Sequence, residues 1–297
     1  MERRRFLSTV GTGVFLGAFG TLHALPRRLE RVGGPKIKLS LNAYSFNQAL
    51  RSGSMTLTQL LDFSAEQNFD AVDLTGYYFP GYPAVPSDEV VNSVKRQAYV
   101  AGLAISGTGV RNDFRNPDPE KRKDDIRLVC GWIELAARLG APALRIFAGR
   151  DLDPGQDRRQ ATRWVVDSIR ECLPVAARNG VVLVLQNHFE FLKTPEQTLE
   201  LLEIIDSEWL AMNLDIGSYR GPDPYAEVRQ VAPYATTWQI KENVFVNNVE
   251  EPTDLGRVVE ILREVDFRGY ILVETLGEGD PYVKVPRFLE SVRKALA

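Results

Sequence analysis

Short apolar runs recur along the 297-residue chain, and polar or ionisable side chains stand where several of them end. The last four runs end in Gln186, Asn187, His188, Asp215, Gln239, Lys241 and Glu274. Carboxylate and amide oxygens are donors that hard cations prefer, while a carboxylate, an imidazole or an ammonium can move a proton or stabilise an anion. Because a polar group that ends an apolar run is costly to bury unsatisfied, Asp215 and Glu274 favour a shared site over separate loop caps or ion pairs.

The apolar runs in the first half of the chain end in a second polar set. Its members are Asn42, Tyr44, Asp73, Tyr77, Arg111 and Arg145. We predict that these residues and Asn187 bind the same small ligand. The tyrosine rings can stack on a flat ligand face, although they stack equally well on core side chains.

Apolar runs of strand length alternate with longer amphipathic segments from Lys36 onward. The expected strands are Ile37–Ala43, Ala71–Leu74, Ala104–Ser106, Ala143–Phe147, Val181–Leu185, Leu210–Leu214, Thr236–Ile240 and Tyr270–Val273. The expected helices span residues 56–67, 87–101, 119–139, 157–179, 194–205, 223–231, 253–264 and 282–296. Eight strand–helix units in strict alternation predict a parallel sheet with the helices outside, and eight is the number that closes a (β/α)8 TIM barrel.

The alternative architecture is an open, doubly wound sheet, which usually begins with a Gly-rich turn. The first expected strand instead leads into Asn42-Ala43-Tyr44-Ser45-Phe46, without a GxGxxG motif. We therefore predict a single (β/α)8 TIM barrel over residues 36–297. The active site of such a barrel lies at the carboxyl ends of its strands, where both polar sets stand.

The first thirty residues are predicted to be a leader rather than part of the fold. Arg3-Arg4-Arg5-Phe6-Leu7 has the twin-arginine pattern, and a mildly apolar, Gly-rich run from Val10 to Leu25 follows it. This pattern predicts export by the twin-arginine route to a periplasmic or other extracytoplasmic location. The alternatives are a basic, frayed terminus and a single anchor helix. Beyond residues 1–30, no apolar stretch of about 20 residues predicts insertion into a membrane.

Charge and histidine content exclude two classes of function. Residues 1–30 hold five Arg and two Glu, so the remaining chain, with 31 of the 36 basic and 37 of the 39 acidic residues, has a formal net charge of −6. An acidic chain without a basic stripe binds nucleic acid poorly, so no nucleic-acid partner is expected. His188 is the only histidine beyond the leader, which excludes a three-histidine metal site within one chain.

Four strand-end motifs carry a family resemblance. They are Leu183-Val-Leu-Gln186-Asn-His188, Asn213-Leu-Asp215, Trp238-Gln239-Ile-Lys241 and Leu272-Val-Glu274. In their order and strand placement they resemble the xylose-isomerase-like barrel superfamily of sugar isomerases and epimerases, over essentially the whole chain after the leader. Residues 71–82 and 105–113 look more locally like a bacterial branch of sugar phosphate isomerases and epimerases.

The resemblance implies one divalent metal held by Gln186, Asp215, Gln239 and Glu274, which match the family's Glu, Asp, His and Glu ligands. This chain departs from that pattern at two positions, since Gln186 stands for Glu and Gln239 for His. Two carboxylates and two amide oxygens would suit Mn²⁺, Mg²⁺ or Ca²⁺, bound more weakly than in the relatives. The alternative is a barrel in which both glutamines hydrogen bond to a sugar and no metal is bound.

For function, the resemblance implies an isomerase or epimerase that abstracts a proton next to a carbonyl group. Gln186 cannot act as a base, so Glu274, His188 and Lys241 are the candidate catalytic residues. The alternatives are that His188 is a hydrogen-bonded wall residue beside the substrate and that Lys241 only pairs with Glu274 or Asp215. The leader favours a non-phosphorylated sugar or glycoside as the substrate, because phosphorylated sugars are mainly cytoplasmic. The alternatives are a lyase or hydratase that acts on a 3-keto-glycoside and a non-catalytic sugar-binding barrel. Assembly into a homo-oligomer is compatible with each of these functions.

Overall fold

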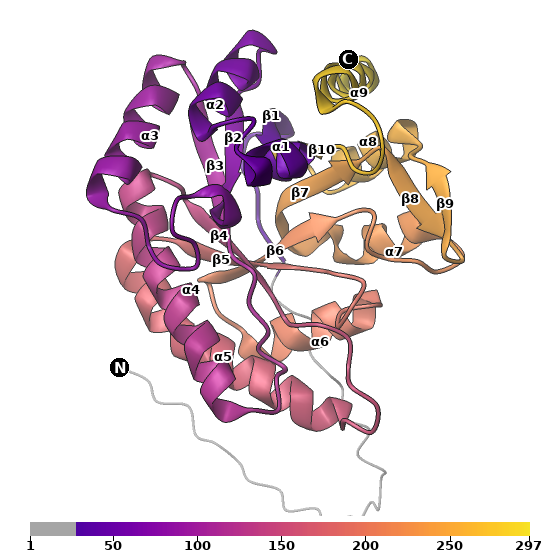
Figure 1. The fold of residues 1–297 in the computed structure, drawn as a ribbon. Coiled ribbons are helices and arrows are strands. Elements are labelled where there is room, and N and C mark those ends of the chain that lie inside the picture. The colour runs from indigo at the N-terminus through magenta and orange to yellow at the C-terminus, as the bar shows by residue number, and fades with distance from the viewer. Residues whose placement is uncertain (1–27) are drawn as a thin grey trace, which may run out of the picture.

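A computed structural model describes residues 28–297, so all but the end of the predicted leader lies outside the described residues. Eight parallel strands form a closed barrel in the order β1-β10-β7-β6-β5-β4-β3-β2 (Figure 1). They are β1 (Lys36–Asn42), β2 (Ala71–Thr75), β3 (Ala104–Gly109), β4 (Ala143–Phe147), β5 (Val182–Gln186), β6 (Leu210–Asp215), β7 (Ala235–Lys241) and β10 (Arg268–Glu274). The prediction of a (β/α)8 TIM barrel is therefore confirmed.

At least one helix follows each of these strands along the chain, and the helices lie around the barrel (Figure 1). They are α1 (Asn47–Ser52), α2 (Leu57–Glu66), α3 (Asp88–Val100), α4 (Pro119–Leu139), α5 (Arg158–Asn179), α6 (Pro195–Ile205), α7 (Pro224–Val231), α8 (Leu255–Glu264) and α9 (Pro281–Leu296). The short α1, which stands before α2, was not expected. Local capping fixes where they begin: Thr56 and Gln59 form a capping box at the start of α2, and Ser87 accepts a hydrogen bond at the start of α3. No helix of the described residues is long and apolar enough to cross a membrane.

A two-stranded hairpin interrupts the alternation after β7, and the sequence pattern does not predict it. Strand β8 (Asn243–Val246) pairs with β9 (Val249–Pro252), whose exposed residues lack the apolar alternation of a half-buried strand. The chain that leaves the hairpin returns to the end of β7, where Thr253 Oγ1 donates to the carbonyl oxygen of Lys241 at 2.7 Å. The hairpin therefore fixes the backbone of the residue that ends β7.

The interior of the barrel is apolar only near its floor. Ala143, Val184 and Ala211 form a small buried cluster that is separate from the main core between strands and helices. Side chains two residues apart on a strand share a face, so the residues after these on each strand point into the barrel above the cluster. Those residues are Arg145, Gln186, Asn213 and Asp215. The barrel therefore carries a polar layer directly above its apolar floor.

Candidate functional site

The buried acids of the described residues all lie at one end of the barrel. They are Asp73 on β2, Asp215 on β6 and Glu274 on β10, each at most 3% exposed. Gln186 and Gln239 are equally buried at the ends of β5 and β7. The carboxyl ends of the strands thus converge on a ring of polar groups that water reaches poorly.

The structure brings the four predicted metal ligands together as two hydrogen-bonded pairs. Gln186 Nε2 donates to Asp215 Oδ2 at 2.7 Å, and Gln239 Nε2 donates to Glu274 Oε2 at 2.8 Å. A carboxylate has no proton to donate, so the amide group that faces it must be the NH₂ group. The orientation of both glutamine side chains is therefore fixed by their acidic partners.

Lys241 links the two pairs. Its Nζ lies 2.6 Å from Asp215 Oδ2 and 3.4 Å from Glu274 Oε2. Burial alone would lower the pKa of Lys241, but the two carboxylates outweigh it and raise that pKa above its ordinary value. A protonated ammonium therefore stands between the two carboxylates.

Neighbouring groups hold this cluster in place. The backbone N–H of Gly217 donates to Asp215 Oδ1 at 2.9 Å, and a side chain at position 217 would place its Cβ 2.9 Å from Lys241 Cδ. Asn213 Nδ2 donates to Gln239 Oε1 at 3.1 Å, and Thr237 Oγ1 donates to Asn213 Oδ1 at 2.8 Å. Both carboxylate oxygens of Asp215 are thus already engaged.

These donors do not fit a divalent cation between Asp215 and Glu274. The oxygens of Gln186 and Gln239 point away from the acids, toward Arg145 and Asn213. In residues 28–297 no group of three or more His, Cys, Asp or Glu side chains could hold a metal ion. A metal bound by the four predicted ligands would require both amides to turn over and the ammonium to leave.

Buried polar atoms lack partners on the side of the barrel that β4, β3, β2 and β1 form. Strands β2 and β4 flank β3, which lies opposite β7 in the closed barrel. Asp73 Oδ1 on β2, Arg145 Nε on β4 and Asn42 Nδ2 on β1 are buried and make no hydrogen bond. Native proteins rarely leave buried polar atoms unpaired, so these three atoms indicate a polar ligand.

The charge states on this wall suit such a ligand. Burial raises the pKa of Asp73, and nearby Glu274 raises it further, although Arg145 acts in the opposite direction. Burial would lower the pKa of Arg145, but Tyr77, Asp73 and Glu274 raise it overall. This side of the barrel therefore presents the charged guanidinium of Arg145 beside the carboxyl group of Asp73, which holds its proton more tightly than usual.

Replacing Gly109 by alanine is expected to disturb this wall while leaving the barrel folded. Its Cβ would lie 2.7 Å from Arg145 Nη2 and 2.8 Å from Cζ, so the guanidinium must move. We expect ligand affinity to fall by roughly tenfold, the worth of one hydrogen bond to a charged group. The loss of affinity is measured by calorimetric titration with a sugar that binds the unchanged protein. The control is Gly131→Ala in a helix, whose Cβ would meet only Val85. Unchanged affinity in Gly109→Ala would contradict the role given to Arg145.

Asn187, predicted to contact the ligand, has a different role in the structure. Its Nδ2 donates to the carbonyl oxygen of Asp215 at 2.9 Å, and its Oδ1 accepts from the Asp215 N–H at 2.8 Å. The side chain is fully buried, so neither end is left for a ligand. Asn187 positions the backbone of Asp215, which corrects the sequence-based prediction.

His188 lies at the edge of the cluster. Its Nδ1 is 3.0 Å from Glu190 Oε2 without an aligned hydrogen bond, and its ring packs edge-on against Phe147. Burial lowers the pKa of His188 to about 4; Asp215 opposes this shift, and neighbouring cations, Lys241 first among them, add to it. The imidazole is therefore neutral near pH 7 and cannot donate a proton as an imidazolium. A neutral imidazole can still accept a proton, so the catalytic role of His188 stays a prediction.

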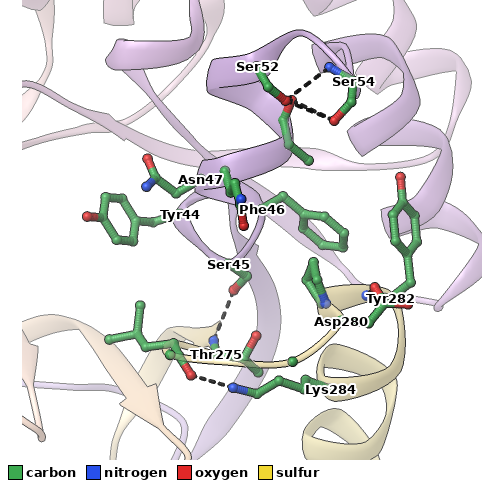
Figure 2. Close-up of a pocket in the computed structure, with 16 residues that line it drawn as sticks. Tyr44, Ser45, Phe46, Asn47, Ser52, Ser54, Thr275, Asp280, Tyr282 and Lys284 are labelled. Atoms are coloured by element: carbon green, nitrogen blue, oxygen red, sulfur yellow. Dashed lines mark hydrogen bonds between the residues drawn. The ribbon is translucent and has the colours of Figure 1, made fainter.

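Two cavities open beside the polar ring. One of about 610 Å³ is lined by Tyr44, Tyr77 and Arg111, three of the predicted ligand-binding residues, together with Tyr82 and Asp125. The other, of about 700 Å³, lies between the loops that follow β1 and β10 (Figure 2). Tyr44 lines both. Asp215, Lys241 and Glu274 line neither cavity, because they lie more deeply buried.

The strand-end reasoning misses two kinds of residue. Asp125 on α4 and Arg51 on α1 line the first cavity from helices, and a search of strand ends cannot find them. Thr237, by contrast, shares a face with Gln239, so the period of two along β7 is a signal that could have found it.

Comparisons with known proteins agree with this fold. The family model described as "Xylose isomerase-like TIM barrel" matches residues 61–292. No curated protein sequence gives a significant match.

Solved structures of similar fold include two epimerases. A D-psicose 3-epimerase from Clostridium cellulolyticum H10 is 16% identical with a TM-score of 0.72, over 87% of this chain and 99% of that chain. A 3-keto-D-glucoside 4-epimerase from E. coli is 16% identical with a TM-score of 0.71, over 87% and 100%. The IOLI protein, solved with a bound zinc atom, is 17% identical with a TM-score of 0.67, over 87% and 96%. At these identities the likeness is one of fold.

Proposed function

Because the chain belongs to the xylose isomerase-like TIM barrel family, we propose that it is an enzyme that moves a proton next to the carbonyl group of a non-phosphorylated sugar or glycoside, in an isomerisation or epimerisation. The observation that carries this proposal is the pairing of Lys241 Nζ with Glu274 Oε2 at 3.4 Å at the active end of the barrel. It places a cation beside a carboxylate where both are shielded from water. Such a pair can remove a proton and stabilise the anion that results.

In the proposed reaction Glu274 is the base. Gln239 and Lys241 both contact its Oε2, which leaves Oε1 to take a proton from the carbon next to the carbonyl. The electron pair of the C–H bond forms a C=C bond, and the carbonyl oxygen becomes an oxyanion. Lys241 has three N–H groups, of which one is donated to Asp215 and one faces Glu274, so the third can donate to that oxyanion.

The return of the proton decides the reaction. If Glu274 delivers it to the former carbonyl carbon while the hydroxyl proton on the other carbon passes to the oxyanion, the carbonyl group moves to that other carbon, which gives isomerisation. Epimerisation needs a donor on the opposite face, and Asp73 is the buried acid available for that step, since its raised pKa favours the protonated form. The unpartnered Oδ1 of Asp73 supports this assignment.

The amide at position 186 favours a second candidate function. A glutamine ends β5, where the resemblance implies a carboxylate, and its side chain is engaged by Asp215 and Arg145. A lyase or hydratase that acts on a 3-keto-glycoside needs only one base and a group that stabilises the enolate. Glu274 and Lys241 would supply both.

The loop after β10 supports a substrate without a phosphate group. In barrels that bind phosphate, the last loops and a helix N-terminus usually hold it. Here the carboxylate of Asp280 accepts from the Tyr282 N–H at the start of α9, and Lys284 Nζ donates to the carbonyl oxygens of Leu276 and Glu278. Neither the helix end nor the lysine is free for a phosphate.

A substrate panel tests the proposal. The purified protein is incubated with free ketoses, 3-keto-glycosides and the matching sugar phosphates, and each mixture is followed by NMR. We expect conversion of a free sugar or glycoside to its isomer, its epimer or an elimination product. Turnover of a sugar phosphate without turnover of the free sugar would contradict the substrate class. Binding without conversion across the panel would favour the non-catalytic sugar-binding barrel.

We also propose export by the twin-arginine route, supported by the Arg3-Arg4-Arg5-Phe6-Leu7 pattern near the start of the sequence. Cell fractionation of the 297-residue chain should recover it outside the cytoplasm. Replacing Arg3 and Arg4 by lysine should retain it inside, while the same replacement at Arg27 and Arg28 should not. Equal distribution of all three proteins would contradict the proposed location.

A further inference from the structure

The position between Asp215 and Glu274 is a cation site by its chemistry. Two buried carboxylates lie within reach of one ammonium, and like charges at this depth need a counter-ion. Lys241 Nζ meets one at 2.6 Å and the other at 3.4 Å, and its side chain is only 16% exposed. The counter-ion is therefore a covalent part of the chain.

The surrounding groups are arranged for an ammonium and not for a metal. Gln186 and Gln239 present N–H groups to the acids, and the third acceptor site on Asp215 is filled by the Gly217 N–H. An N–H group repels a metal ion, whereas a lysine needs only carboxylate acceptors. Gly217 also leaves room for the lysine stem, because any Cβ there would come within 2.9 Å of Cδ.

We propose that the Lys241 ammonium takes the place of a divalent metal in this barrel, so that the site works with a built-in cation. The role of the ammonium toward a substrate oxygen rests on the proposed function. Its occupation of the cation position does not, because metal binding can be measured without a substrate. Failure of one claim is therefore distinguishable from failure of the other.

Calorimetric titration with Mn²⁺ and thermal unfolding with and without Mn²⁺ test the inference. The whole chain should give no binding isotherm at millimolar Mn²⁺, and neither Mn²⁺ nor a chelator should shift its Tm. Lys241→Ala should have a lower Tm, gain a one-to-one Mn²⁺ isotherm and recover part of the lost Tm when Mn²⁺ is added. Adding Gln239→His to Lys241→Ala should strengthen that binding, since an imidazole nitrogen would replace an N–H donor.

Lys284→Ala is the matched control, because Lys284 pairs with Glu242 at 3.1 Å away from the buried acids. This variant should gain no Mn²⁺ affinity. One-to-one Mn²⁺ binding by the unchanged chain that is lost in Glu274→Gln would overturn the inference. So would a folded Lys241→Ala variant that binds no Mn²⁺. If Lys241→Ala does not fold, the Mn²⁺ titration of the unchanged chain is the deciding experiment. Absence of Mn²⁺ binding supports the inference, and Mn²⁺ binding that depends on Glu274 overturns it.

Discussion

Glu274→Gln is expected to lower the turnover of the sugar substrate by about 10²–10⁴-fold, the usual contribution of a positioned acid/base group. Glutamine keeps the size of the side chain and an oxygen that can still accept from Gln239 Nε2, but it cannot take a proton. The fold should therefore survive while proton abstraction is lost. Steady-state kinetics give kcat and KM, and the effect should fall mainly on kcat.

A matched control lies in the loop that follows the same strand. Glu278→Gln removes an acid outside the buried ring, and its turnover should remain near that of the unchanged protein. Loss of turnover in both variants would point to a general effect of charge near the site. Retained turnover in a folded Glu274→Gln variant would show that another group is the base.

Lys241→Met is expected to lower both turnover and stability. Methionine keeps much of the apolar stem but leaves Asp215 and Glu274 without their shared cation. Removing one partner of a buried ion pair costs about 3–5 kcal/mol of unfolding free energy, and losing a donor to an oxyanion costs about 10²–10³-fold in kcat. The sequence alone predicts Lys241 as a catalytic residue; the two buried carboxylate contacts add a role in stability.

The loss of turnover can be separated from the loss of stability. Turnover is measured per folded molecule at a temperature well below the Tm of the variant, with the folded fraction read by circular dichroism. Lys241→Arg, which keeps a positive charge but moves its donors, should recover stability more than turnover. Equal recovery of both would indicate that Lys241 serves only to neutralise the acids.

The barrel could be predicted because its signal is spread along the chain. Each apolar run and each amphipathic segment repeats the same pattern, so the count of eight strand–helix units does not depend on any single residue. The hairpin β8–β9 was not predicted, because the exposed residues of β9 carry no hydrophobic period. The hairpin holds the end of β7, and this role follows only from the contact between Thr253 and Lys241.

The sequence predicts which residues form the site better than it predicts what each residue does there. Strand parity and strand ends bring Gln186, Asp215, Gln239 and Glu274 to one place, because parallel strands end at the same face of the barrel. The direction in which each amide points depends on its partner across the barrel. Asn187 is predicted from the sequence to contact the ligand. In the structure it instead makes two contacts with the backbone of Asp215, which are set by the strand register.

The most direct measurement is solvent deuterium uptake during turnover in D₂O, in the presence of a chelator and resolved by position with NMR. Proton transfer through Glu274 and Lys241 predicts deuterium at a carbon next to the carbonyl group in the product or the recovered substrate. It also predicts that the chelator leaves the rate of uptake unchanged. Product that forms with neither deuterium uptake nor a primary isotope effect from substrate deuterated at that carbon would contradict the account, because the C–H bond next to the carbonyl group would then stay intact.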